Sequence, residues 1–89
     1  MAEVEFTAQL QRHVSAPTTS VDARTVREAL ERVLAAHPRL RGYVLDEQGR
    51  LRQHVAVFLD GEMIADRVGL SDPVRPESRL LVMQALSGG

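Results

Sequence analysis

The sequence predicts an α+β fold, in which a mixed sheet of four or five strands packs on one main helix. Apolar and polar residues alternate near the N-terminus, a helix-capping pattern precedes an apolar stripe of helical period, and a short apolar run lies near the C-terminus. A helix and a sheet each have an apolar face to bury, so we expect them to pack together. The 89 residues suffice for one domain with one hydrophobic core.

The N-terminal part of the chain predicts a strand, a turn and a second strand. From Val4 to Leu10 the residues alternate with a period of two, which is typical of a strand with one buried face. The segment from His13 to Thr19 contains Pro17 and favours a turn. A short strand from Thr18 to Val21 then completes the predicted hairpin.

The central part predicts the main helix. Thr25 is followed three residues later by Glu28, which forms a capping box in which each side chain can accept a backbone N–H. Pro38 disfavours helical geometry at His37, so we expect the helix to end near Ala36. Five apolar residues recur at helical spacing and predict the buried face: Val26, Ala29, Leu30, Val33 and Leu34.

After the helix, we expect a loop from Leu40 to Gly49, with its apolar residues Tyr43, Val44 and Leu45 packed against the helix end. Val55 to Leu59 is an apolar run and predicts a strand. Asp60-Gly61 accepts the positive φ angles of a tight hairpin turn, so Glu62 to Ala65 should pair back.

The C-terminal part predicts a loop and a last strand. Arg67 to Ser78 contains Gly69, Pro73 and Pro76, which favour a loop across the domain. Arg79 to Leu86 is rich in Leu, Val and Met and indicates a central strand covered on both faces.

Composition and charge exclude several classes of function. The formal net charge of -1 gives no long-range attraction to nucleic acid or to an anionic membrane, so neither is expected as a partner. The chain has no cysteine, which excludes disulfides and a thiol nucleophile. No apolar segment approaches the roughly 20 residues that span a bilayer, and we expect a cytoplasmic protein.

The side chains offer little catalytic chemistry. His13, His37 and His54 are isolated in the sequence, so no metal site is expected. Asp46 with Glu47, and Asp66 with Asp72, are acidic pairs in predicted loops and are interpreted as turn residues. We therefore expect a protein that is not itself an enzyme.

The terminal Gly88-Gly89 is the unusual feature of the sequence. Two glycines arise at a chain end by chance in roughly 0.5% of sequences. Glycine has no Cβ, so an extended diglycine can enter a narrow channel in another protein. A terminal carboxylate, with an ordinary pKa of about 3.5, is ionised at neutral pH and can attack the α-phosphate of ATP. This predicts a β-sheet domain over residues 1–84 and a flexible tail over residues 85–89 that carries the reactive group.

Together these features resemble the ubiquitin-like sulfur carriers, a family with the β-grasp fold that includes the small subunit of molybdopterin synthase and the thiamine sulfur carrier. The resemblance covers nearly the whole chain. It rests on the helix start Thr25 to Leu30, the loop Leu45 to Arg52, the hairpin Val55 to Glu62, and Gly88-Gly89.

The resemblance implies that an E1-like adenylyltransferase consumes ATP to adenylate Gly89. A sulfur donor then converts Gly89 to a thiocarboxylate, and a downstream biosynthetic enzyme accepts the sulfur. The carrier itself binds no cofactor. Its pathway, whether molybdopterin, thiamine, cysteine or tRNA thiolation, stays open.

The resemblance also implies that partners dock on the open sheet face. Leu80 and Val82 should then point to the core, and Phe58, Leu81 and Met83 outward. The alternative is that these last three are core residues. The predicted partner-binding set is completed by the segment that leads to the diglycine, namely Ala85, Leu86 and Ser87.

Two other functions remain open at this point. A protein modifier would transfer the activated Gly89 to a lysine of a target protein, and it needs the same diglycine. A β-grasp adaptor would carry the diglycine without using it.

Overall fold

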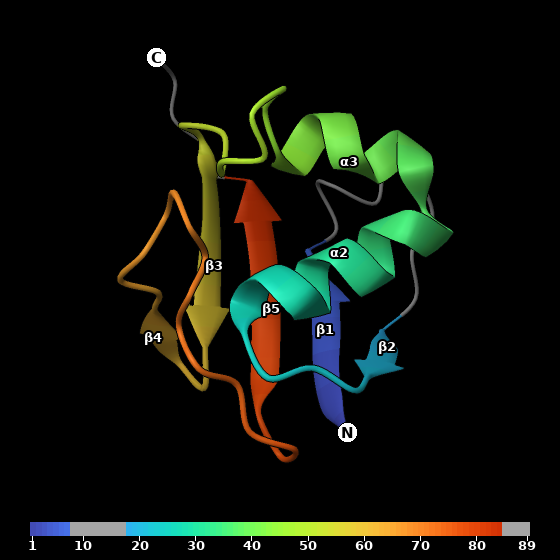
Figure 1. Ribbon diagram of the computed structural model, residues 1–89, viewed down its shortest axis with the longest axis vertical. Coiled ribbons are helices and arrows are strands. Elements are labelled where there is room, and N and C mark those ends of the chain that lie inside the picture. Colours follow the sequence, from blue (N-terminus) through green and yellow to red (C-terminus); the bar gives the residue numbers. More distant parts are fainter. Residues whose placement is uncertain (8–17, 85–89) are drawn as a thin grey trace.

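The computed structural model describes residues 1–7 and 18–84, and these residues form a mixed five-stranded sheet with two helices on one side (Figure 1). The strands are β1 (Ala2–Phe6), β2 (Thr19–Val21), β3 (Val55–Leu59), β4 (Glu62–Met63) and β5 (Arg79–Gln84). The helices are α2 (Val26–Ala36) and α3 (Pro38–Val44). No helix of the described residues is long and apolar enough to cross a membrane.

The order of strands across the sheet is β2-β1-β5-β3-β4. The central strand β5 runs parallel to β1 and antiparallel to β3. The two edge strands, β2 and β4, have three residues and two residues, and each pairs antiparallel with its neighbour. Short edge strands leave few unpaired backbone groups for another chain to pair with.

Helix α2 begins and is buried as the sequence predicts. The Thr25 hydroxyl accepts the Glu28 N–H at 3.2 Å, and the Glu28 carboxylate accepts the Arg24 N–H at 2.7 Å. The second bond of the predicted capping box therefore forms with the N–H of Arg24 and not with that of Thr25. The five predicted apolar residues are all at most 1% exposed, and they pack on the sheet face formed by Val4, Phe6, Val57, Leu80 and Val82.

The predicted loop after the main helix is wrong in its first part, where the chain forms helix α3. Pro38 ends α2 as expected, but it also occupies the first turn of α3. There its fixed φ and missing N–H suit a helix start. Val44 and Leu45 are buried as predicted, whereas Tyr43 is 40% exposed. The described residues therefore form two helices where one main helix was expected.

Three strands also differ from the prediction. β1 begins two residues earlier than expected and ends at Phe6, while residues 8–10 lie outside the described residues. β4 ends at Met63, earlier than the predicted Ala65; Ile64 still donates its N–H to the Val57 carbonyl at 3.0 Å, and its side chain is buried in the core. Along β5 buried residues alternate with more exposed ones, so the expectation of a strand buried on both faces is wrong.

The turn between β3 and β4 has the predicted geometry. Asp60 has a φ of 51° and Gly61 a φ of 87°. Two consecutive positive φ angles match the right-handed twist of the flanking strands. The hairpin places Phe58 opposite Met63 on neighbouring strands.

Candidate functional site: the open face of the sheet

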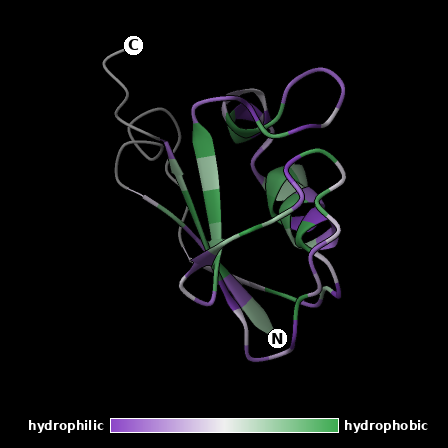
Figure 2. Ribbon diagram, turned by 90° about the vertical axis from the view of Figure 1, so that its left-hand side faces the viewer, coloured by the Kyte–Doolittle hydropathy of each residue, from purple (hydrophilic) through white to green (hydrophobic). Residues whose placement is uncertain are grey.

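One face of the sheet has no described helix on it. Figure 2 shows both helices on one side of the strands. Side chains alternate between the two faces along each strand, so the register assigns the residues of the uncovered side. We call this side the open face; it comprises Glu3 and Glu5 of β1, Arg79, Leu81 and Met83 of β5, Ala56 and Phe58 of β3, and Met63 of β4.

The core positions expected on β5 are confirmed. Leu80 is 1% exposed and Val82 is fully buried. Phe58, Leu81 and Met83 lie on the open face and are each partly exposed, so they do not belong to the core between sheet and helices. Their role in binding a partner stays a prediction.

The open face is hollowed between its strands. A depression of about 530 Å³ is lined by the apolar side chains of Phe58, Leu81 and Met83. Glu3, Glu5 and Arg79 line it as well. Sequence reasoning missed the two glutamates, although Glu5 occupies an outward position of the period-two pattern that predicted β1.

The predicted reactive end lies outside the described residues. β5 ends at Gln84, which pairs with Val55 of β3. The site predictions for Ala85, Leu86, Ser87, Gly88 and Gly89 therefore remain predictions. What the structure supplies is the position of the preceding residue, at the end of the central strand and beside Met83.

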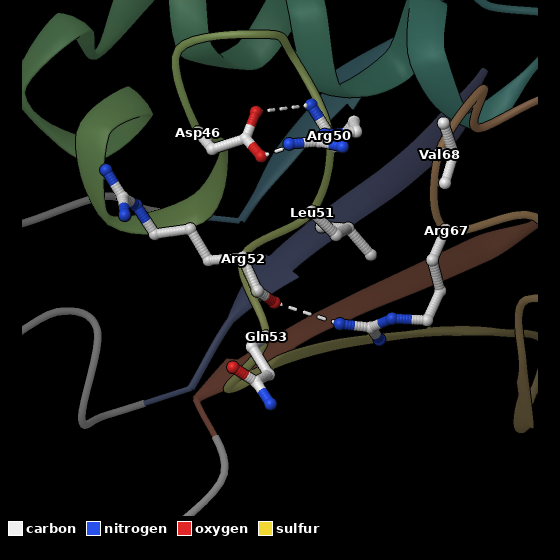
Figure 3. A pocket seen from close by; sticks show the side chains of 7 residues that line it. All are labelled: Asp46, Arg50, Leu51, Arg52, Gln53, Arg67 and Val68. Carbon is white, nitrogen blue, oxygen red and sulfur yellow. Dashed lines mark hydrogen bonds and ion pairs between the residues drawn. The ribbon is translucent and has the colours of Figure 1, made fainter.

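A second depression lies at the loop between α3 and β3 (Figure 3). Arg50, Arg52 and Arg67 line it, but each guanidinium has a structural partner. Arg50 Nε donates to Asp46 at 3.1 Å, Arg52 Nε to the Gly42 carbonyl at 2.6 Å, and Arg67 Nη2 to the Arg52 carbonyl at 2.9 Å. In Figure 3 the three guanidiniums point in different directions and do not converge on one point. We therefore interpret these arginines as residues that hold the loop in place.

Arg27 holds the same region from helix α2. Its guanidinium donates to the carbonyls of Gly49, Val68 and Gly69 at 2.9, 3.1 and 3.0 Å. The three residues that accept these bonds lie 22 to 42 residues away in the chain. No local signal in the sequence could have indicated this contact.

The acidic loop residues act as turn residues. Asp66 accepts the Ser71 hydroxyl at 2.6 Å and the Gly69 N–H at 2.8 Å, and these bonds lower its pKa to about 2. Hydrogen bonds from the backbone N–H groups of Ala65 and Asp66 likewise lower the pKa of Asp72. The pKa of Asp46 is lowered chiefly by the hydrogen bond from the Arg50 N–H.

The described histidines are not grouped. His37 lies between the two helices and His54 is exposed in the loop before β3, while His13 lies outside the described residues. Over residues 1–7 and 18–84, no group of three His, Cys, Asp or Glu side chains could hold a metal ion.

The fold and the open face together define a ubiquitin-like β-grasp protein. Residues 4–89 match the model of the ThiS family, a span that includes the diglycine. The chain therefore belongs to the ThiS family. The comparison with curated proteins gives no match.

Solved structures support the same placement. The small archaeal modifier protein SAMP1 of Haloferax volcanii is 30% identical, with a TM-score of 0.84 over 99% of this chain and 98% of its own. The Amycolatopsis orientalis BexX/CysO complex contains a chain that is 21% identical, with a TM-score of 0.83 over the whole of both chains. CysO of Mycobacterium tuberculosis is 16% identical, with a TM-score of 0.80 over 97% of this chain and all of its own. The last two likenesses are likenesses of fold.

Proposed function

We propose that this protein is a sulfur carrier whose working group is the Gly89 carboxylate. The observation that carries the proposal is the family match, which runs through the whole fold to the diglycine. Small carriers of this family are generally not catalytic, and over residues 1–7 and 18–84 no group of three His, Cys, Asp or Glu side chains could hold a metal ion. The protein is then a co-substrate, and the enzymes that it visits supply the catalysis.

The chemistry of the carrier has two steps. In the first, an oxygen of the Gly89 carboxylate attacks the α-phosphate of ATP in an E1-like adenylyltransferase, and pyrophosphate leaves. In the second, hydrosulfide supplied by a sulfur donor attacks the acyl carbon and AMP leaves, which converts Gly89 to a thiocarboxylate. A downstream enzyme then accepts that sulfur. ATP is consumed by the activating partner, so the carrier needs no bound cofactor, and we expect the cycle to run in the cytoplasm.

The fold supports this function by its arrangement of strand end and open face. β5 is the central strand, and its end at Gln84 lies beside Met83 and Ala56 of the open face. Five residues follow Gln84, and an extended chain of that length reaches at most about 17 Å. A partner that grips Phe58, Leu81 and Met83 could therefore hold Ala85, Leu86 and Ser87 in a channel that ends at its own active site.

Protein modification is the second candidate function. It is favoured by the 30% identity to SAMP1, a small archaeal modifier protein. In that case a lysine of a target protein, and not a sulfur donor, attacks the activated Gly89 and receives its acyl group. This chain contains no lysine, so it could not form chains of itself through lysine side chains.

Intact-mass spectrometry separates the two functions. The protein is incubated with the E1-like enzyme encoded in the same genome, ATP and a sulfide source. Replacement of one oxygen by sulfur supports the carrier, whereas added copies of this chain on lysines of other proteins support the modifier. A variant lacking Gly89 is the control. An unchanged mass and no conjugates with the intact chain would favour an adaptor.

A further inference from the structure

A single row of side chains crosses the open face from acidic to apolar. The register places Glu5 of β1 opposite Leu81 of β5, Leu81 opposite Phe58 of β3, and Phe58 opposite Met63 of β4. Neighbouring residues of such a row lie about 4.5–5.5 Å apart at Cβ and act as one surface. The row therefore carries a carboxylate at one end and three apolar side chains after it.

The acidic end has little compensation within the described residues. Glu5 is exposed, and no described Arg or His lies within ion-pair distance of it. Glu3, on the same strand, reaches Arg79 at 3.7 Å, and the Arg79 side chain is 81% exposed. Two carboxylates and one loosely held cation thus line the hollow beside the apolar side chains.

This combination restricts what can cover the face. A purely apolar partner would bury Phe58 and Leu81 favourably, but it would also remove water from Glu5 without replacing the lost hydrogen bonds. A second copy of this chain would bring a further pair of carboxylates with only one more arginine. A partner that presents cations next to an apolar protrusion satisfies both halves of the face.

The family resemblance already implies that partners dock on the open face; we propose that Glu5 fixes the orientation in which the activating enzyme docks there, by pairing with an arginine or lysine that flanks the enzyme's apolar contact. The proposal rests on the proposed function for the identity of the partner. Buried apolar contacts with Phe58, Leu81 and Met83 supply the affinity, while the charge on Glu5 selects the register of docking. Glu5 is thus a specificity-determining residue remote from Gly89.

The test compares two charge reversals of equal size. Glu5→Lys changes the acidic end of the row, and Glu47→Lys changes an exposed glutamate in the loop on the helix side of the domain. Glu5→Gln removes the charge but keeps the shape. Binding to the E1-like enzyme of the same genome is measured by calorimetry without ATP, and pyrophosphate exchange is measured in parallel. Thermal melting verifies that each variant is folded.

At low salt we expect Glu5→Lys to raise the Kd roughly tenfold and Glu5→Gln about threefold, with Glu47→Lys unchanged. At about 1 M salt, where the Debye length is about 3 Å, the differences should shrink. Equal effects of the two reversals, or no binding by the unchanged protein, would overturn the proposal. Sedimentation that shows a dimer broken by Leu81→Asp would do the same. Binding that depends on Glu5 without pyrophosphate exchange would count against the proposed function alone.

Discussion

The Ser78 hydroxyl donates to the Asp60 carboxylate at 3.0 Å and joins the β3–β4 turn to the start of β5. The other carboxylate oxygen of Asp60 accepts the Arg79 N–H at 2.9 Å. Ser78 is 2% exposed and its oxygen also accepts the Arg75 N–H. The Asp60 bonds to Ser78 and Arg79 position the start of β5 relative to the end of β3. They thereby support the register that pairs Leu81 with Phe58.

Ser78→Ala should lower the free energy of unfolding by about 1–3 kcal/mol, because it leaves the Arg75 N–H and one Asp60 oxygen without their partner. Ser20→Ala, on the exposed side of β2, is the matched control and should change stability by less than about 0.5 kcal/mol. Urea unfolding measures both. Equal stability of the two variants would show that the Asp60–Ser78 bond does not hold β5 in place.

Leu30→Ala should destabilise the domain by about 2–5 kcal/mol, since Leu30 is fully buried between α2 and the sheet and its truncation leaves a cavity. Val68→Ala removes apolar atoms from a side chain that is 62% exposed and should cost less than about 0.5 kcal/mol. Chemical denaturation with a common slope for both variants provides the comparison. A loss below about 1 kcal/mol for Leu30→Ala would be evidence against the assigned core.

The sequence predicted the fold where a periodic signal and a local stop signal agree. Residues close together in the sequence predicted the buried face of α2, its start at Thr25 and the Asp60-Gly61 turn. The helix α3 was missed because Pro38 was read only as a helix stop. Its role as the first turn of the next helix uses the same property of proline.

The contacts that sequence could not give are those between distant residues. Arg27 bonds to carbonyls of two loops, and Leu70 is fully buried with a φ of 55°, a conformation that is uncommon for leucine. The outward placement of Leu81 followed from the family resemblance, not from the apolar run itself. The position of Glu5 beside Leu81 on the open face became evident only from the strand register.

Two glycines should respond to alanine with opposite signs. Gly61 has a φ of 87°, so Gly61→Ala should destabilise by about 1–2 kcal/mol. Gly42 lies within α3, and a Cβ there would meet no atom within 4 Å, so Gly42→Ala should stabilise by about 0.5–1 kcal/mol. Thermal melts of both variants decide the point. Destabilisation by Gly42→Ala would show that α3 is not a regular helix at this position.

Asp66→Asn should reduce the acid sensitivity of the fold. Hydrogen bonds from Ser71 and Gly69 lower the pKa of Asp66 from 3.8 to about 2, so the folded state binds fewer protons here than the unfolded state. The resulting stability is present above about pH 4 and is lost as the pH falls toward 2. The Tm of Asp66→Asn should therefore change less between pH 5 and 2 than that of the unchanged protein. Glu47→Gln is the control, and an identical pH profile for Asp66→Asn would contradict the prediction.

Deletion of Gly89 should separate activation from folding. The residue removed follows the last described strand residue, Gln84, by five positions, so no described contact is lost and the Tm should shift by less than about 2 °C. Adenylation by the E1-like enzyme, measured as pyrophosphate exchange, should fall to background. The new terminal carboxylate is displaced by one residue from the site of attack. Phe58→Ala is the informative companion, since it should weaken binding to the enzyme while leaving Gly89 available. A Gly89 deletion that still exchanges pyrophosphate would refute the assignment of Gly89 as the acyl donor, whatever the behaviour of the open face.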